Sequence, residues 1–332
     1  PTYSTSSSRP TSGAARGYVP EDFGADGTLV RFGLIQLQPL AEAPFALRWV
    51  RVAQRVVDLL HGKDVLDRQL ARVADLVPAR DPAELVLPPG RFEDLGGLLA
   101  AAIEVSRGGV AHPVVLLSGP AGAGRTTLLA AAAASVGLRT LRVRVAALPR
   151  DELAVRALGA TLVREAVLWG ALILLDGIDQ RAADAGRHDL DLVMFAWYPG
   201  PIAATAGRIT GKPPAFARGI VVIELGVPDE PAREELWARA LPPAAPTALP
   251  RWAAERYFVT PGVIGQAATA AVAKAQARDG AFALGPADVH DGLRGVLDAK
   301  LTTLGTRITW RQTWDDLVLP DDAALEIREF IA

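Results

Sequence analysis

The sequence contains no cysteine, and its only lysines are Lys63, Lys212, Lys274 and Lys300. The absence of cysteine excludes disulfides and thiolate metal sites and makes no demand on the redox compartment. The 4 histidines are dispersed along the chain and lack the spacing of metal ligands. The formal net charge is only −2 at pH 7, so a basic surface for a nucleic-acid partner is not expected.

Long apolar runs are also missing. The longest, Val167 to Leu175, reaches about half of the roughly 20 residues that a membrane helix requires. No apolar segment near the start resembles a signal peptide. We therefore expect a soluble, cytoplasmic protein with no membrane partner. The chain has no initiating Met and stops inside a helical pattern, which suggests a fragment of a longer protein.

The first third of the chain changes character twice. Residues 1–30 are rich in Ser, Thr, Gly and Arg with few apolar side chains, which predicts a flexible tail. Val52, Val56 and Leu59 recur at helical spacing, so 31–78 is predicted to be a small all-α N-terminal element. The prolines of 79–90 indicate a linker.

From 91 to 227, short apolar strands alternate with helical patterns. The expected strands are Pro113–Ser118, Leu138–Val145, Ala171–Leu175, Pro201–Thr205 and Ile220–Leu225, and the expected helices are Leu95–Ser106, Arg125–Val136 and Asp151–Leu168. This alternation predicts an α/β fold with a parallel sheet covered on both faces.

After Pro228 the strands cease, and helices at 229–241, 251–258, 261–278 and 286–303 predict a small all-α lid over 228–304. Thr260 and Pro261 suit the start of the third of these helices, with Thr as N-cap and Pro at the first position. The remaining residues, 305–332, are expected to be a connector.

One segment between a predicted strand and a predicted helix reads GPAGAGRT, from Gly119 to Thr126. It matches the P-loop pattern G-x-x-x-x-G-K-[ST] except at the Lys position. Small residues let backbone N–H groups wrap a phosphate, and the helix N-terminus adds a favourable dipole. The residues predicted to bind ATP or ADP are Gly119, Pro120, Ala121, Gly122, Ala123, Gly124, Arg125, Thr126 and Thr127, with Thr126 offering its hydroxyl to Mg²⁺. The alternative is a Gly-rich strand–helix turn without a ligand.

Arg125 occupies the Lys position of this pattern. A Lys side chain is a slim point charge that reaches the β- and γ-phosphates, whereas a planar guanidinium is bulkier and not interchangeable with it. We therefore expect nucleotide binding to survive and the γ-phosphate geometry to loosen. The alternative is a drift from Lys to Arg without loss of activity.

The apolar strand from Ala171 ends in Asp176, the Walker B pattern, and this carboxylate is predicted to hold Mg²⁺ through water. The acidic residue that normally follows, to polarise the attacking water, is replaced by Gly177. Asp179 is a candidate replacement for this acidic residue, but the direction of its side chain after a Gly turn cannot be predicted from the sequence. A structural alternative for Asp176 is capping a turn at the strand end.

These motifs resemble those of the AAA+ superfamily in their order: GPAGAGRT, a long helix, LILLDG, a strand ending Ala204-Thr205-Ala206, and a helical lid. The resemblance implies that Thr205 is a sensor residue and that Ala206 stands where a polar Asn is common. Arg218, just before the last strand, matches the position of an arginine finger reaching a neighbouring subunit. A surface Arg solvating the strand start is an equal alternative. The implied catalytic set is therefore Asp176, Thr205 and Arg218.

Within that superfamily, the chain is similar to the ATPase of phage-tail-like contractile injection systems. Four segments carry the likeness: Leu47–Leu70, Leu168–Ala171 leading into LILLDG, Phe258–Ile264 and Thr313–Pro320. The resemblance implies a tandem AAA+ protein whose first, degenerate module is this chain. It also implies assembly as a homo-oligomeric ring, a hexamer, that serves an injection particle or its cargo proteins.

Three hypotheses remain open at this stage. The first is a nucleotide-binding, ring-forming module with little or no hydrolysis. The second is a working motor ATPase in which Arg125 and Asp179 substitute adequately. The third is an adaptor whose nucleotide pocket is empty.

Overall fold

The computed structural model describes residues 23–24, 27–38, 47–79, 81–87, 90–180, 195, 197–209, 216–279 and 284–302. The chain divides into two compact units, one comprising residues 1–235 with 258–262 and the other residues 236–257 with 263–332. The predicted connector, its segment Thr313–Pro320 and most of the predicted tail lie outside the described residues.

A six-stranded sheet in the order β3-β5-β6-β7-β4-β8 organises the first unit. Its strands are β3 (Ala74–Val77), β4 (Val114–Ser118), β5 (Arg139–Arg144), β6 (Ala171–Asp176), β7 (Ile202–Ala206) and β8 (Ile220–Glu224). Strand β3 runs antiparallel to β5, and every other pairing in the sheet is parallel. The α/β fold with a mostly parallel sheet is thereby confirmed.

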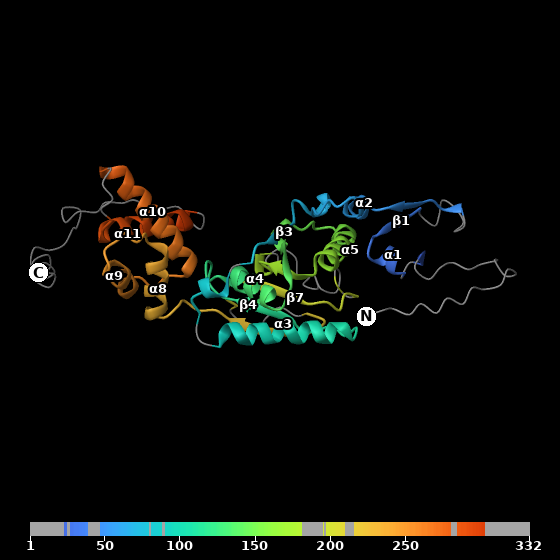
Figure 1. Cartoon of the computed structure of the whole chain (residues 1–332), viewed down its shortest axis with the longest axis horizontal. Coiled ribbons are helices and arrows are strands. Elements are labelled where there is room, and N and C mark those ends of the chain that lie inside the picture. Colours follow the sequence, from blue (N-terminus) through green and yellow to red (C-terminus); the bar gives the residue numbers. More distant parts are fainter. Residues whose placement is uncertain are drawn as a thin grey trace, which may run out of the picture. The chain divides into compact units, whose positions relative to one another are not determined.

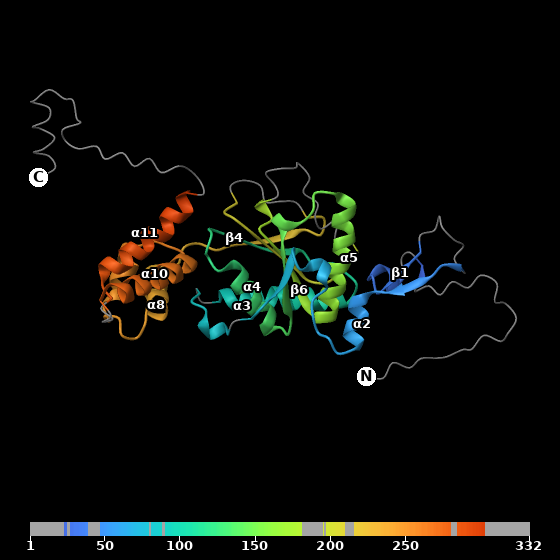
Figure 2. The same cartoon turned by 90° about the horizontal axis from the view of Figure 1, so that it is seen from above.

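Helices cover the sheet on both faces, and this is why its central strands read as unbroken apolar runs. On one face lie α3 (Arg91–Arg107) and α4 (Arg125–Ser135), whose Leu99 and Leu129 pack with Leu117 and Leu174. On the other face lies α5 (Glu152–Trp169), with Leu162 against Leu116 and Ile173. Figures 1 and 2 show α3 and α4 together and α5 apart from them.

The prediction of an all-α element at 31–78 is wrong. Only α1 (Thr28–Arg31), α2 (Gln54–Leu60) and the 3₁₀ turn Arg68–Leu70 are helical there. Strands β1 (Ile35–Leu37) and β2 (Val50–Val52) form a separate antiparallel pair, and β3 joins the main sheet. A few apolar residues are too few to distinguish the 3.6-residue period of a helix from the 2-residue period of a strand. Pairing with a distant strand also overrides the local preference for helix.

A buried charge network fastens this N-terminal segment to α5. Glu165 is 0% exposed; it accepts hydrogen bonds from Arg55 Nε at 3.1 and 3.2 Å and from Trp169 Nε1 at 3.0 Å. The neighbouring Arg164 donates to Gly33 O at 2.7 Å and to Asp67 Oδ2 at 2.5 Å. Because a buried charge is costly unless paired, these partners hold Gly33, Arg55 and Asp67 in place against α5.

The second unit is helical, as predicted. It comprises the second half of α8 (Glu230–Ala240), α9 (Leu249–Arg256), most of α10 (Pro261–Asp279) and α11 (Pro286–Thr302). Trp237, Ala267 and Ala271 are each 0% exposed in this unit. The bounds differ from the expected lid at 228–304, because the second unit begins at Leu236, residues 258–262 belong to the first unit, and the second unit continues beyond 304.

Candidate nucleotide-binding site

The predicted P-loop joins β4 to α4. Gly124 is the N-cap of α4 and contributes no side-chain hydrogen bond, and Arg125 is the first helical residue. The first backbone N–H groups of a helix have no partner within the helix. They are therefore directed toward the loop, and this is the arrangement that anion binding at a helix N-terminus requires.

Three of the predicted site residues meet beside this loop. Thr126 Oγ1 donates to Asp176 Oδ1 at 3.3 Å, and Thr205 Oγ1 donates to the same oxygen at 2.5 Å. They come from α4, β6 and β7, and the parallel pairing of β6 with β7 and of β7 with β4 places the strand ends side by side. The structure thus brings Thr126 and Asp176 together although they are 50 positions apart in the chain.

This pair of oxygen ligands fits Mg²⁺. The cation prefers hydroxyl, carboxylate and phosphate oxygens at about 2.1 Å and keeps several waters. Thr126 and Asp176 would hold it, and the bound ion would neutralise phosphate charge. Among the described residues, no group of three or more His, Asp and Glu side chains offers another metal site.

Arg125 contacts the loop itself. Its NH1 group donates a hydrogen bond of 2.9 Å to Gly119 O, at the start of the loop. A guanidinium in this position braces the loop from within. Its contact with a phosphate stays a prediction.

Arg218 has a structural task inside the chain. Its guanidinium donates to the carbonyl oxygens of Phe195, Tyr198 and Gly200 at 3.0, 2.6 and 3.2 Å. These bonds fix the chain that leads into β7. The role of Arg218 as an arginine finger toward a neighbouring subunit stays a prediction.

Sequence reasoning missed a second support of the loop, from residues 258–262. Thr260 Oγ1 donates to Ala121 O at 3.0 Å, and Gly262 N donates to Gly122 O at 2.8 Å. Thr260 is 6% exposed, so its hydroxyl is committed to this contact. The sequence indicated Thr260 only as the N-cap of a helix. Its place in Phe258–Ile264, one of the four segments that carry the family likeness, was the only sign of a further role.

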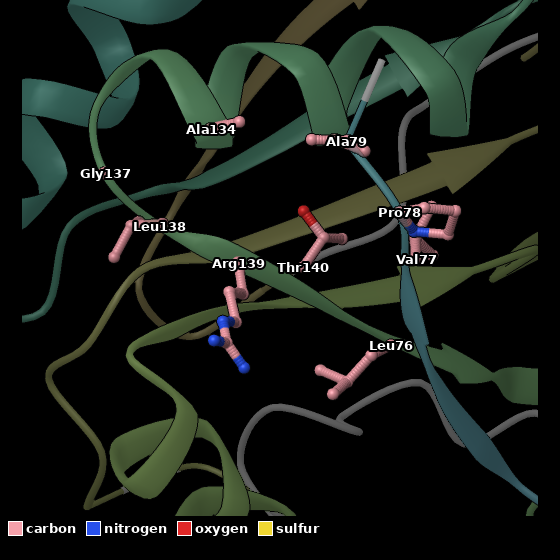
Figure 3. Close-up of a pocket in the computed structure, with 10 residues that line it drawn as sticks. Leu76, Val77, Pro78, Ala79, Ala134, Gly137, Leu138, Arg139 and Thr140 are labelled. Atoms are coloured by element: carbon pink, nitrogen blue, oxygen red, sulfur yellow. The ribbon is translucent and has the colours of Figure 1, made fainter.

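A cavity of about 510 Å³ lies elsewhere in the first unit (Figure 3). It is lined by the end of β3 and the residues that follow it, the second half of α4 and the start of β5, including Pro78, Ala134 and Thr140. The Thr140 hydroxyl is buried without a hydrogen-bond partner in the described chain. The cavity lies at the amino end of β5, whereas the P-loop follows the carboxyl end of β4. None of the predicted site residues lines it.

Solved structures of AAA domains resemble this chain. The FIGL-1 AAA domain matches with a TM-score of 0.52 and 15% identity over 81% of this chain and 95% of that chain. The chain has the AAA fold. The FIGL-1 AAA domain in complex with ADP matches with a TM-score of 0.53 and 14% identity over 78% and 92%. A structure on katanin self-assembly matches with a TM-score of 0.50 and 15% identity over 79% and 95%.

No protein-family model and no curated protein matches the sequence. In this AAA fold the P-loop, Asp176 and Thr205 all lie at the carboxyl edge of the parallel sheet, where open α/β sheets bind their ligands. Within the described part of the chain, no helix is long and apolar enough to span a bilayer.

Proposed function

We propose that this chain is a nucleotide-binding AAA+ module that takes ATP or ADP with Mg²⁺ at residues 119–127 and hydrolyses ATP slowly or not at all. The observation that supports it most directly is the 3.3 Å contact between Thr126 Oγ1 and Asp176 Oδ1 beside the helix N-terminus. A hydroxyl and a carboxylate placed together there suit a metal-bound phosphate. The FIGL-1 AAA domain, which shares the fold, is known in complex with ADP.

Each residue has a defined part in this proposal. The loop N–H groups bind the phosphates, and Thr126 and Asp176 hold the cation. Thr205 keeps the Asp176 carboxylate in place through its hydrogen bond of 2.5 Å. Arg125 lies at the loop and supplies positive charge near the phosphates.

Weak hydrolysis is supported by what the site lacks. Gly177 has no carboxylate for the attacking water, and Ala206 is apolar and 1% exposed at the end of β7. The Arg125 guanidinium bonds Gly119 O. Losing one preorganised polar group costs about 3 kcal/mol of barrier, although such losses within one site need not add.

We further infer a place in a ring-forming, hexameric ATPase of a contractile injection system, which acts on the injection particle or its cargo. The sequence likeness supports this, and two of its segments touch in the fold. Arg55 from the first lies 5.8 Å from the ring of Trp169 from the second, and both bond Glu165. The katanin neighbour concerns self-assembly, and head-to-tail contacts that close generate rings.

Isothermal titration calorimetry tests nucleotide binding. The chain is expected to bind ATP and ADP with micromolar or weaker affinity, and Thr126→Ala is expected to remove the Mg²⁺-dependent part. No heat with either nucleotide at millimolar concentration would contradict the proposal and favour the adaptor hypothesis.

Steady-state phosphate release separates the remaining two hypotheses. The proposal expects very slow turnover. A rate of about one per second or more, abolished by Asp176→Ala, would instead establish a working motor.

A further inference from the structure

The chain makes a tight turn directly after β6. Gly177 has a φ of +75°, a left-handed conformation that other residues rarely adopt. Ile178 N then donates to Thr205 O at 3.0 Å, and the Ile178 side chain is buried. Gln180 N bonds Gly177 O at 3.1 Å and closes the turn. This turn decides where the next acidic side chain, Asp179, is placed.

The Asp179 carboxylate lies against the end of β7. A Cβ atom built on Gly207 would lie 2.9 Å from Asp179 Oδ2. Gly207 does not have a left-handed backbone, so a side chain there would not strain the backbone. It would instead disturb the carboxylate that lies close to this position. Gly207 follows Ala206, two residues after Thr205, whose hydroxyl bonds Asp176. Asp179 thus joins Asp176 at the carboxyl edge of the sheet.

The Asp179 side chain is available to a ligand. The residue is exposed, and among the described residues its carboxylate has no hydrogen-bond or ion-pair partner. Asp179 is the first helical residue after the turn, whereas Asp151 caps α5 from the position before the helix through Ala154 N at 2.7 Å.

We propose that Asp179 replaces the acidic residue missing at Gly177 and holds the attacking water during residual ATP hydrolysis. This inference rests on the proposed nucleotide site. A carboxylate at the site edge, next to the end of β7, can accept a hydrogen bond from water and orient its oxygen toward the terminal phosphate. The Gly177 turn brings this acidic side chain, at the third position after Asp176, to the end of β7.

The reaction balances as follows. The water oxygen forms a bond to the γ-phosphorus, and the bond between that phosphorus and the β–γ bridging oxygen breaks. ADP leaves with the bridging oxygen and its electron pair, and inorganic phosphate forms. One water proton passes to the Asp179 carboxylate and then to solvent, so the residue returns to its ionised state.

Two variants test the proposal on the whole chain. Asp179→Asn keeps the size of the side chain and removes its basicity. It is expected to lower the single-turnover rate of ATP hydrolysis by about 100-fold and to leave ATP affinity unchanged. Gly207→Ala places a methyl group 2.9 Å from Asp179 Oδ2, so the carboxylate must move, and is expected to lower the rate while keeping the charge. Asp291→Asn, which changes an aspartate with 59% side-chain exposure on α11, is the matched control.

A binding measurement adds a readout that does not depend on turnover. ADP with aluminium fluoride imitates the phosphoryl group in transfer with its in-line water. Wild type is expected to bind this complex more tightly than ADP, and Asp179→Asn is expected to lose that gain while binding ADP normally. If Asp179→Asn and Gly207→Ala act through the same carboxylate, the variant that carries both substitutions will hydrolyse ATP no more slowly than Asp179→Asn alone.

The outcomes separate the inference from the proposed function. If wild type binds no nucleotide, the proposed function fails. If wild type binds ATP but shows no measurable hydrolysis, or if Asp179→Asn matches wild type in both rate and aluminium fluoride binding, the role of Asp179 is overturned and nucleotide binding stands.

Discussion

The hydroxyl of Thr205 links the end of β7 to the end of β6. It donates to Asp176 Oδ1 at 2.5 Å and accepts a hydrogen bond from Gly177 N at 3.0 Å. The register pairs Leu175 with Ala204, so the next residues on each strand meet at the sheet edge. One buried side chain thereby fixes both the candidate metal ligand and the turn that follows it.

Thr205→Val keeps the shape of the side chain and removes this hydroxyl. Thr205 is 1% exposed, so the backbone N–H of Gly177 is left unpaired, and we expect a loss of about 1–3 kcal/mol in the free energy of unfolding. The Mg²⁺-dependent part of ADP affinity should fall too, because Asp176 is no longer held. Urea unfolding and calorimetry measure the two effects. Thr205→Ser, which keeps the hydroxyl, should lie near wild type, and equal behaviour of the Val and Ser variants would contradict the assignment.

Arg125→Lys restores the usual P-loop residue. A Lys side chain reaches the terminal phosphates without the guanidinium bond to Gly119 O. We expect the ratio of ATP to ADP affinity to rise about tenfold, which corresponds to about 1.4 kcal/mol. Arg125→Ala, measured in the same titration, should bind both nucleotides more weakly than wild type. Indistinguishable ratios in the Lys and Arg proteins would show that Arg125 already serves as an adequate replacement.

Arg55→Ala removes the main partner of a fully buried carboxylate. Breaking a buried pair on one side leaves an uncompensated charge, here Glu165, and typically costs about 3–5 kcal/mol. The effect is measured as a lower free energy of unfolding in urea. The double variant Arg55→Met with Glu165→Leu should recover much of this loss, since no charge remains to be buried. Arg51→Ala, on the exposed strand β2, is the control and should change little.

Arg218→Ala distinguishes a structural role from a role toward a neighbour. The guanidinium bonds three backbone carbonyls of residues 195–200, and hydrogen bonds to charged groups contribute about 1.5–3 kcal/mol each. We expect a lower melting temperature for the isolated monomer. An unchanged monomer combined with lost hydrolysis in the assembled protein would instead identify an arginine finger.

Tyr198 makes stability depend on pH in the alkaline range. Burial raises the pKa of its phenol from 10.0 to about 12, and the nearby Arg218 charge opposes this shift. Because the folded pKa lies above the unfolded one, the native state retains the proton longer. The contribution is complete below pH 10 and is lost as the pH rises toward 12, at about 1.4 kcal/mol per pH unit. The unfolding free energies of wild type and Tyr198→Phe should diverge across this pH range. Parallel curves would refute the contribution of Tyr198 to the pH dependence.

Local patterns were sufficient for most of the AAA core. The apolar strands β4 and β6 and the helices α4 and α5 were predicted within a residue or two, because each is long enough for its period to be read. The glycines before Arg125 also indicated the loop between β4 and α4. For the lid, helices α8 to α11 were predicted correctly by the same reasoning.

The N-terminal segment was beyond local reasoning. Strand β3 is only Ala74–Val77, and it becomes a strand by pairing with β5, more than 60 residues later. The Glu165 network likewise joins Arg55 to a helix 110 positions away. Short elements lack a readable period, and the energy that fixes them comes from partners that the neighbouring sequence does not contain.

The sequence by itself determined the candidate nucleotide site: a glycine-rich loop before a helix, Thr126, and a carboxylate ending an apolar strand. Only the tertiary structure decided that Thr260 supports the loop, that Arg218 bonds carbonyls of its own chain and that Asp179 lies against Gly207. Backbone propensity and spacing act over a few residues and can be read along the chain. The direction of a side chain after a left-handed turn depends on which distant backbone it meets, and that is set when the strands pair.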